Sequence, residues 1–262
     1  MSQSHRSYSF GNTTEFISNN FGMIFLAVLF LVIGFFAGSI WTENQILKSD
    51  TKPNKQAANA DNPTPTVQPN AQNEPSQEVL SKMPQISDQD HKRGAKNPKI
   101  YLVEYSDYEC PYCEKFHLVM EQIIAEYGDQ VSWVYRHYPL AFHPNARPAA
   151  QTAECVADLA GDDAFWSFSD AVFAQNKKLG GKLSPEAIDE AVKASGADMA
   201  AVKDCAGSSK AADIVTAQME GGAAAGINGT PGTMLLTADG EYQLITGALP
   251  YDQIKQAVEK YL

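Results

Sequence analysis

A short apolar stretch runs into two closely spaced cysteines and then into a helical pattern, and this order constrains the fold more than any other feature of the chain. Residues 100–105 (IYLVEY) predict a buried strand, and apolar residues at i, i+3, i+4 and i+7 spacing predict a helix over residues 111–127. Residues 131–138 predict a second strand. Strand, helix and strand at this spacing are typical of a parallel crossover, which indicates an α/β fold.

The rest of the C-terminal part contains a helical block followed by a hairpin. Residues 146–225 carry an Ala-rich helical pattern that glycines interrupt, without a good strand pattern. Residues 233–237 and 242–246 predict two strands on either side of an Asp-Gly turn. Residues 250–261 predict a closing helix.

An apolar segment near the N-terminus predicts a membrane anchor. Residues 21–41 contain no charged residue over 21 positions, enough for a helix to span a hydrocarbon core about 30 Å thick. Trp41 ends the segment, where an indole ring favours the headgroup region. A cleaved signal peptide is the alternative, because residues 37–39 are small, but the apolar segment is long for one. Residues 1–20 would form an N-terminal tail.

The charges beside this segment leave its orientation open. Arg6 lies on the N-terminal side, whereas Lys48, Lys52 and Lys55 lie on the C-terminal side. The positive-inside rule, applied to these charges alone, would leave the large domain in the cytosol. Acidic residues are interspersed among the lysines, so the bias is small.

The composition after the anchor predicts a tether. Residues 49–90 are rich in Pro, Asn, Gln, Ser and Ala and contain almost no large apolar residue, so they cannot bury enough surface to order themselves. We therefore expect a flexible linker over residues 42–90. The chain as a whole carries 20 basic and 31 acidic residues, a formal charge of −11, which disfavours nucleic acid as a partner.

Cys110 and Cys113 have the spacing of a redox pair at the start of a helix. The free N–H groups and the positive dipole end of a helix stabilise a thiolate at the position of Cys110. Pro111 fits the first helical position, and Cys113 lies one turn later within disulfide reach. Cys110 would then attack and Cys113 would resolve the mixed disulfide. Half of a zinc site and a chance structural pair are the alternatives, although no second close ligand pair accompanies these cysteines.

Glu104 is the only charged residue of the strand before the cysteines. If both faces of this strand are covered, burial raises the pKa of Glu104, which could then relay the proton of the Cys113 thiol. Alternatively, Glu104 lies at the end of the sheet and reaches water. Residues 228–232 (NGTPG) have the composition of a turn, in which the isomer of Pro231 cannot be inferred from one sequence.

The other cysteines and the histidines have less specific patterns. Cys155 and Cys205 lie on the helical block and either form a disulfide or act as small buried hydrophobes. The histidines share no ligand spacing with a carboxylate or cysteine, so we expect no metal site and assign surface or helix-packing roles to His117, His137 and His143. The aromatic residues Phe165, Trp166 and Phe168 are expected in the core.

Four stretches, in this order, resemble the membrane-tethered DsbA-like thiol:disulfide oxidoreductases. They are YLVEYSDYECPYCEKF, YRHYPLAFHPNA, AECVADLAGDDAFWSFSDAVF and GINGTPGTMLL. The resemblance covers about residues 90–262 and implies a thioredoxin fold interrupted by a helical insertion, in which the redox pair faces a cis-proline loop. The expected parts are residues 91–145, the insertion at 146–225, and residues 226–262.

The resemblance also implies roles for individual residues. Cys110 is the nucleophile, Cys113 the resolving cysteine and Glu104 the buried acid. Pro111, Tyr112, Thr230 and Pro231 contact the client, which pairs with the loop like an added strand. Cys155 and Cys205 match a structural cysteine pair found in part of the family. The redox-active disulfide needs no further cofactor.

We therefore expect a monomeric, single-pass membrane protein whose catalytic domain, outside the cytosol, passes disulfides to exported proteins. A DsbB-like or VKOR-like membrane protein would reoxidise it. The dipeptide Pro111-Tyr112 lacks the histidine of the most oxidising members, and Gly232 stands where a bulkier residue is common. An isomerase or reductase of the same fold, a metal-binding thioredoxin-like protein and a non-catalytic adaptor are the alternatives.

Overall fold

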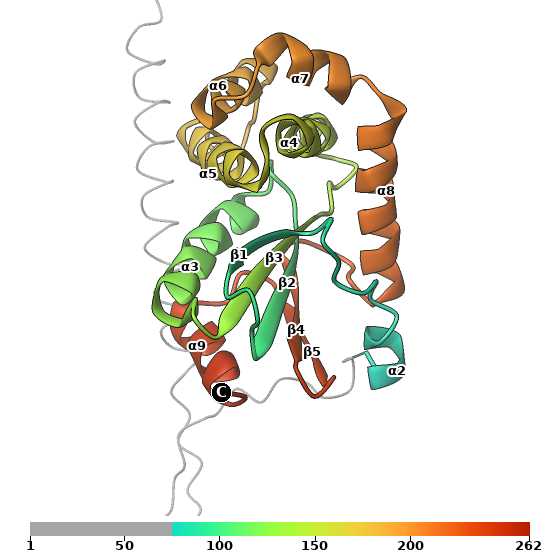
Figure 1. Ribbon diagram of the computed structural model, residues 1–262, viewed down its shortest axis with the longest axis vertical. Helices are drawn as coiled ribbons and strands as arrows, with labels where there is room; N and C mark the ends of the chain where they lie inside the picture. Colours follow the sequence, from blue (N-terminus) through green and yellow to red (C-terminus); the bar gives the residue numbers. More distant parts are fainter. Residues whose placement is uncertain (1–74) are drawn as a thin grey trace, which may run out of the picture. The chain divides into compact units, whose positions relative to one another are not determined.

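The computed structural model describes residues 75–262, which are built around one five-stranded sheet in the order β1-β3-β2-β4-β5 (Figure 1). β2 and β3 are parallel, and the other neighbouring pairs are antiparallel. The strands are β1 (His91–Gly94), β2 (Ile100–Ser106), β3 (Val131–His137), β4 (Gly232–Thr237) and β5 (Tyr242–Thr246). The predicted parallel crossover and C-terminal hairpin are confirmed, and β1 is an additional strand.

The helices fall into two groups. Between β3 and β4 the described chain forms helices only, as the Ala-rich pattern predicts, and α4 to α7 lie together at one end of the sheet (Figure 1). The helices between β3 and β4 are α4 (Ala146–Ala160), α5 (Asp162–Lys178), α6 (Pro185–Ser195), α7 (Met199–Ala206) and α8 (Ser209–Ala224). The remaining helices are α2 (Gln77–Leu80), α3 (Pro111–Tyr127) and α9 (Tyr251–Glu259).

Both faces of the central strand β2 are covered. Ile100 and Leu102 belong to the core formed with α3, whereas Val103 and Tyr105 belong to a second core on the opposite face. Period-two alternation in β2 produces this division. Glu104 points toward the α3 side and is completely buried. The alternative in which this carboxyl reaches water at the end of the sheet is therefore wrong.

The folded part of the chain begins earlier than the composition indicates. Residues 75–90, predicted as the end of the flexible linker, include α2 and pack on the second core through Leu80 and Met83, which are 3% and 4% exposed. Two isolated apolar residues produce no periodic pattern, and the surface that they cover becomes visible only when the sheet is formed. The linker boundary at residue 90 is thus wrong by at least 15 residues.

A buried arginine fastens this N-terminal segment to the sheet. Arg136 of β3 donates from Nε and Nη2 to the two carboxylate oxygens of Asp90, at 2.7 and 3.1 Å. Its remaining hydrogen bonds go to the backbone oxygens of Pro84 and Gln85 and to the hydroxyl of Tyr105. Asp90 and Arg136 are only 8% and 3% exposed. Most hydrogen-bond partners of the buried Arg136 guanidinium therefore come from this N-terminal segment.

The predicted tail (residues 1–20), the predicted transmembrane helix (21–41) and residues 42–74 of the predicted linker lie outside the described part of the chain. Across residues 75–262, none of the helices combines the length and the apolar character needed to cross a bilayer.

We expect Asp90→Ala to lower the free energy of unfolding by about 3 kcal/mol, because the variant leaves a buried guanidinium without its carboxylate. Denaturant unfolding of the reduced protein measures this value. Asp88→Ala is the matched control, since the side chain of Asp88 is fully exposed and should contribute less than about 0.5 kcal/mol. Equal effects of the two variants would contradict the role assigned to Arg136.

Candidate active site

Cys110 occupies the N-cap of α3. Its backbone is extended (φ −75°, ψ 123°), its carbonyl accepts the first helical hydrogen bond from the Glu114 N–H at 3.1 Å, and Pro111 follows at the first helical position. A proline costs nothing there, because that backbone N–H has no helical partner. The sequence ends β2 and starts α3 within a few residues, so this sulfur lies at the positive end of the helix dipole.

The sulfur of Cys110 faces the loop between α8 and β4. The Cys110 sulfur lies 3.7 Å from the backbone oxygen of Thr230, and the Thr230–Pro231 peptide bond is cis, as the family resemblance implies. The structure thus brings together four of the residues singled out from the sequence: Cys110, Cys113, Thr230 and Pro231.

The two cysteines are thiols with opposite acidities. The pKa of Cys110 is lowered to about 6, chiefly because the Cys113 thiol hydrogen-bonds to its sulfur, with further help from backbone N–H groups and from Thr230 against the opposing effect of burial. The pKa of Cys113 is raised well above its ordinary value by burial and by the neighbouring Cys110. At neutral pH, Cys110 is therefore the thiolate and Cys113 the thiol.

Glu104 lies on the sheet beneath this pair. Burial raises the pKa of Glu104 to about 7, although hydrogen bonds from Ser106 and Trp133 lower it. The indole N–H of Trp133 donates to Glu104 Oε2 at 2.9 Å. A carboxyl with this pKa changes its protonation near neutrality, and its charge further raises the pKa of Cys113.

Asp107 positions the loop that carries Cys110, a role that the sequence did not indicate. One oxygen of its buried carboxylate accepts from the Glu109 N–H at 2.7 Å, and the other accepts from the Leu140 N–H and from His143, both at 2.8 Å. The loop after β3 is thereby fixed to the catalytic loop. The local signal for this role is that an aspartate often accepts a hydrogen bond from the backbone N–H two residues later in a turn.

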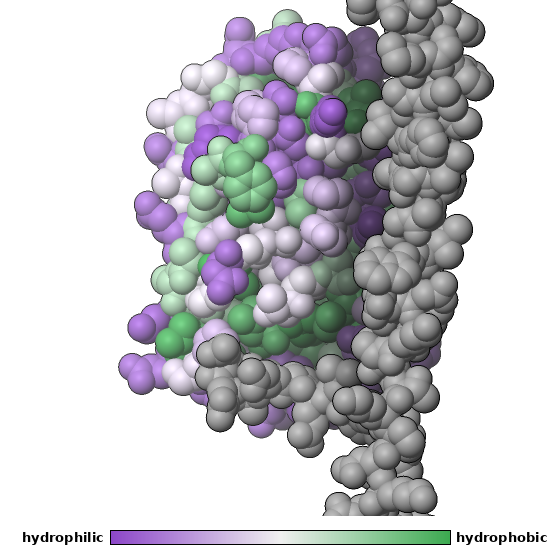
Figure 2. All heavy atoms as spheres, turned by 180° about the vertical axis from the view of Figure 1, so that it is seen from behind, coloured by the Kyte–Doolittle hydropathy of each residue, from purple (hydrophilic) through white to green (hydrophobic). Residues whose placement is uncertain are grey.

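Apolar side chains on the surface near these loops are few. Tyr112 and Phe142 are 62% and 75% exposed, one on α3 and the other in the loop that Asp107 holds. On the face opposite to that of Figure 1, hydrophobic side chains gather in two areas with more polar surface between them (Figure 2). The strongly exposed apolar surface near these loops is therefore limited to single aromatic rings.

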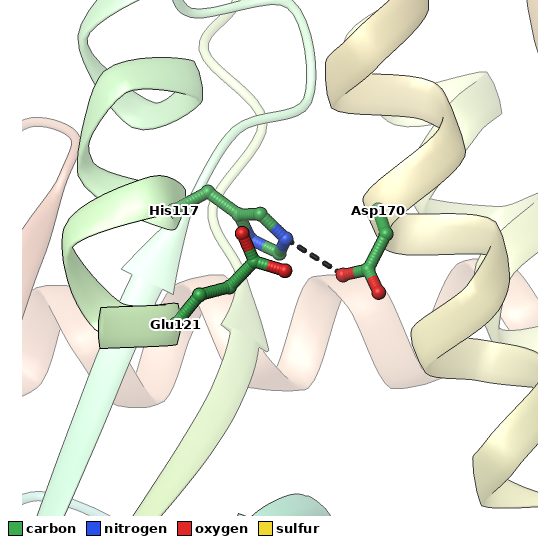
Figure 3. Close-up of side chains that lie close together, drawn as sticks. All are labelled: His117, Glu121 and Asp170. Atoms are coloured by element: carbon green, nitrogen blue, oxygen red, sulfur yellow. Dashed lines mark hydrogen bonds and ion pairs between the residues drawn. The ribbon is translucent and has the colours of Figure 1, made fainter. Parts of the chain in front are cut away.

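His117 forms a charged cluster with Glu121 and Asp170 rather than packing alone (Figure 3). Its Nε2 lies 2.8 Å from Asp170, across the interface between α3 and α5. Three such groups resemble a metal site, but Arg93 already contacts Asp170 at 2.8 Å and Glu121 at 3.6 Å. A divalent cation would have to displace that guanidinium, so the cluster is best explained as an ion-pair network. Cys110 and Cys113 belong to no metal-ligating group of three among residues 75–262.

The predicted roles of the other histidines are confirmed in part. His137 is almost completely buried on β3, with Nε2 3.2 Å from Glu154 of α4, so it does not lie at the surface but packs the sheet against the helices. His143 is partly buried and bonds to Asp107. Burial lowers the pKa of His137, although Glu154 raises it. Phe165, Trp166 and Phe168 are in the core, as predicted.

Cys155 and Cys205 are joined by a disulfide between α4 and α7, with 5.7 Å between their Cα atoms. This bond borders a cavity of about 1130 Å³ that does not include the redox pair. Charged side chains that line the cavity are largely paired with one another, as in Asp90 with Arg136 and Asp158 with Lys210. We therefore place the chemistry at Cys110 and not in this cavity.

Comparisons with known proteins agree with this architecture. A family model described as thioredoxin matches residues 87–260. The Na(+)/H(+) antiporter NhaA 3 of Salinispora tropica is 37% identical over 98 residues, which make up 37% of this chain and 14% of the antiporter. The chain thus spans about a seventh of the length of the curated relatives that it matches.

Solved structures extend the likeness over the whole domain. DsbA2 of Pseudomonas aeruginosa is 26% identical with a TM-score of 0.56, covering 66% of this chain and 94% of that one. The T172V variant of alpha-DsbA1 from Wolbachia pipientis is 18% identical with a TM-score of 0.60, covering 70% and 95%. The predicted thioredoxin-like α/β fold is confirmed.

We expect the raised pKa of Glu104 to make the dithiol protein less stable as the pH rises. The folded state binds the carboxyl proton more tightly than the unfolded state, so the contribution of Glu104 to the free energy of unfolding falls between about pH 4.5 and pH 7. Glu104→Gln should remove about 3 kcal/mol of this fall between pH 4 and pH 8, measured by denaturant unfolding. Glu114→Gln, at a partly exposed site on α3, should retain the wild-type profile. Parallel profiles for wild type and Glu104→Gln would contradict the burial of an ionisable carboxyl.

Proposed function

We propose that this chain, which belongs to the thioredoxin family, is a DsbA-like thiol:disulfide oxidoreductase that exchanges disulfides with exported proteins through Cys110 and Cys113. One observation carries the proposal. A sulfur with a pKa of about 6 lies at the start of α3, one helical turn from a buried thiol and 3.7 Å from the backbone of a cis-proline loop. A cysteine with a purely structural role does not require a lowered pKa, a buried partner thiol and a neighbouring cis-proline loop together.

The exchange follows from the unequal acidities. A client thiolate attacks the Cys110 sulfur of the oxidised pair, the Cys110–Cys113 bond breaks, and its electron pair stays on Cys113. A second client thiolate then attacks the client sulfur of the mixed disulfide, and Cys110 leaves as a thiolate. The client loses two electrons and forms a disulfide, while the enzyme gains two electrons and becomes a dithiol.

Glu104 acts as the acid and base of this cycle. Its pKa of about 7 allows it to give a proton to the Cys113 sulfur on reduction and to take that proton back on reoxidation. The backbone of Thr230, beside Cys110, would pair with the client as an added strand. Tyr112, exposed one residue before Cys113, would contact the same client.

The stabilised Cys110 thiolate favours the oxidase direction. A thiolate that is held as an anion makes the reduced protein more stable and the disulfide more oxidising. At pH 7 about nine-tenths of Cys110 would be ionised with a pKa near 6. The dipeptide Pro111-Tyr112 supplies no cation near the sulfur, which would keep the potential below that of the most oxidising relatives.

A location outside the cytosol is part of the proposal. The Cys155–Cys205 disulfide supports it, because structural disulfides persist in oxidising compartments. The apolar residues 21–41 would anchor the domain to the membrane as a single-pass, monomeric protein. A quinone-linked membrane protein of the DsbB or VKOR type would accept the electrons.

The reduction potential of the Cys110–Cys113 pair tests the direction. Residues 75–262 would be equilibrated with glutathione redox buffers and the thiols counted after alkylation. We expect a potential between about −200 and −120 mV, since DsbA lies near −120 mV and thioredoxin near −270 mV. A value close to that of thioredoxin would reject the oxidase and leave a reductase.

Single cysteine variants test the roles of the two sulfurs. Cys113→Ser should accumulate a mixed disulfide with a client protein that carries a disulfide, because the Cys110 thiolate displaces one client sulfur and no resolving thiol then releases the adduct, whereas Cys110→Ser should form none. Gel electrophoresis without reductant detects the adduct by its lower mobility. Adducts of equal yield in both variants would contradict the assignment of Cys110 as the nucleophile.

The orientation of the full chain is tested with sealed membrane vesicles. We expect protease added to the extracytoplasmic side to remove the domain from the membrane. Digestion only from the cytosolic side would overturn the proposed location, in agreement with the flanking charges, and would leave the exchange chemistry intact.

A further inference from the structure

Four oxygen-bearing side chains share the sheet face below Cys113. Glu104 of β2 lies directly opposite Tyr135 of β3 and Thr233 of β4, and Ser106 lies two residues after Glu104 on the same face. Each is at most 1% exposed. An oxygen atom of each has no full hydrogen bond within residues 75–262. Buried polar atoms without partners are rare, so this group needs a physical explanation.

Ser106 differs from the other members in the groups that it reaches. Its hydroxyl lies close enough to Glu104 and to Cys113 to lower the pKa of both, although burial has the larger and opposite effect on each. No hydrogen bond of full geometry joins it to either group in the dithiol state. The hydroxyl is thus unpaired beside the carboxyl of Glu104, the thiol of Cys113 and the phenol of Tyr135.

The neighbouring groups are less suited to carry a proton. The indole of Trp133 donates its N–H to Glu104 and has no lone pair with which to accept a proton. Burial raises the pKa of the Tyr135 phenol well above its ordinary value, so this group resists giving up its proton. Thr233 lies beyond Glu104 on β4, next to the cis-proline loop. A serine hydroxyl both donates and accepts, as a relay requires.

We propose that Ser106 carries the proton between Glu104 and Cys113. This role rests on the proposed exchange function. When the Cys110–Cys113 bond breaks and Cys113 becomes a thiolate, Ser106 gives its hydroxyl proton to that sulfur and takes the carboxylic proton of Glu104. The serine ends as it began, the carboxyl becomes a carboxylate, and the thiolate becomes a thiol. Reoxidation runs the same transfer in reverse.

The experiment compares Ser106→Thr with Ser106→Val in the full chain. The two replacements have nearly the same shape and differ in the hydroxyl, so any loss of packing is common to both. The oxidised protein is reduced with dithiothreitol, and the rate is followed by tryptophan fluorescence in H2O and in D2O. The ionisation of Glu104 is followed in the dithiol protein by carboxyl infrared absorption. Ser132→Ala is the control, since it removes a buried serine hydroxyl from β3 on the opposite face.

We expect Ser106→Val to be reduced about tenfold more slowly than Ser106→Thr, with a different solvent isotope effect. The pKa of Glu104 should be higher in the valine variant, because the donor that favours the carboxylate is gone. Glu104 is faced by Cys110, Cys113, Tyr135, Ser106 and Trp133, and of these only Ser106 changes. A serine that only donates a hydrogen bond would move the titration of Glu104 but not the isotope effect, and a serine that only fills space would move neither.

The slower reduction of Ser106→Val with its altered isotope effect and the raised pKa of Glu104 are both required. The absence of either overturns the relay. An equal loss of rate in Ser132→Ala would also overturn it, because any buried hydroxyl would then suffice. The titration uses dithiol protein without a client. A failure of the exchange function would therefore appear in the assays of Cys110→Ser and Cys113→Ser, whereas a failure of the relay would appear in the valine and threonine pair.

Discussion

The exclusion of water from the Cys113 sulfur is the constraint on which the rest of the site depends. Because Cys113, in the first turn of α3, is completely buried, it keeps its proton and hydrogen-bonds to Cys110, and this bond is the main reason that the pKa of Cys110 is low. Glu104 is buried by the same packing, since β2 is covered on both faces. One tightly packed interface between a strand and a helix therefore sets three acidities at once.

Much of this arrangement follows from local sequence. Strand alternation places Glu104 toward α3, and the Cys-Pro dipeptide marks a helix start, so the positions of both cysteines and the acid are predictable. The cis state of the Thr230–Pro231 bond is not, because a single sequence reports only the presence of a proline. The family resemblance supplied that expectation, along with the disulfide between Cys155 and Cys205.

The features that sequence reasoning missed all depend on contacts between distant segments. Asp107 gains importance through Leu140 and His143, more than 30 residues away. Likewise, the segment before β1 reads as a linker because its composition is polar, and its anchor is Arg136, 46 residues later. A buried arginine in an apolar strand could have raised the question of where its counter-charge lies.

The anchor at Arg136 has a mechanical consequence. Its hydrogen bonds to Pro84, Gln85 and Asp90 join the entering chain to the middle of the sheet. A force applied at residue 75 would act on the contacts of α2 with β5 and on these hydrogen bonds to Arg136. The catalytic loop follows the end of β2 and is held separately by Asp107. The redox pair is thereby shielded from mechanical force transmitted along the polypeptide.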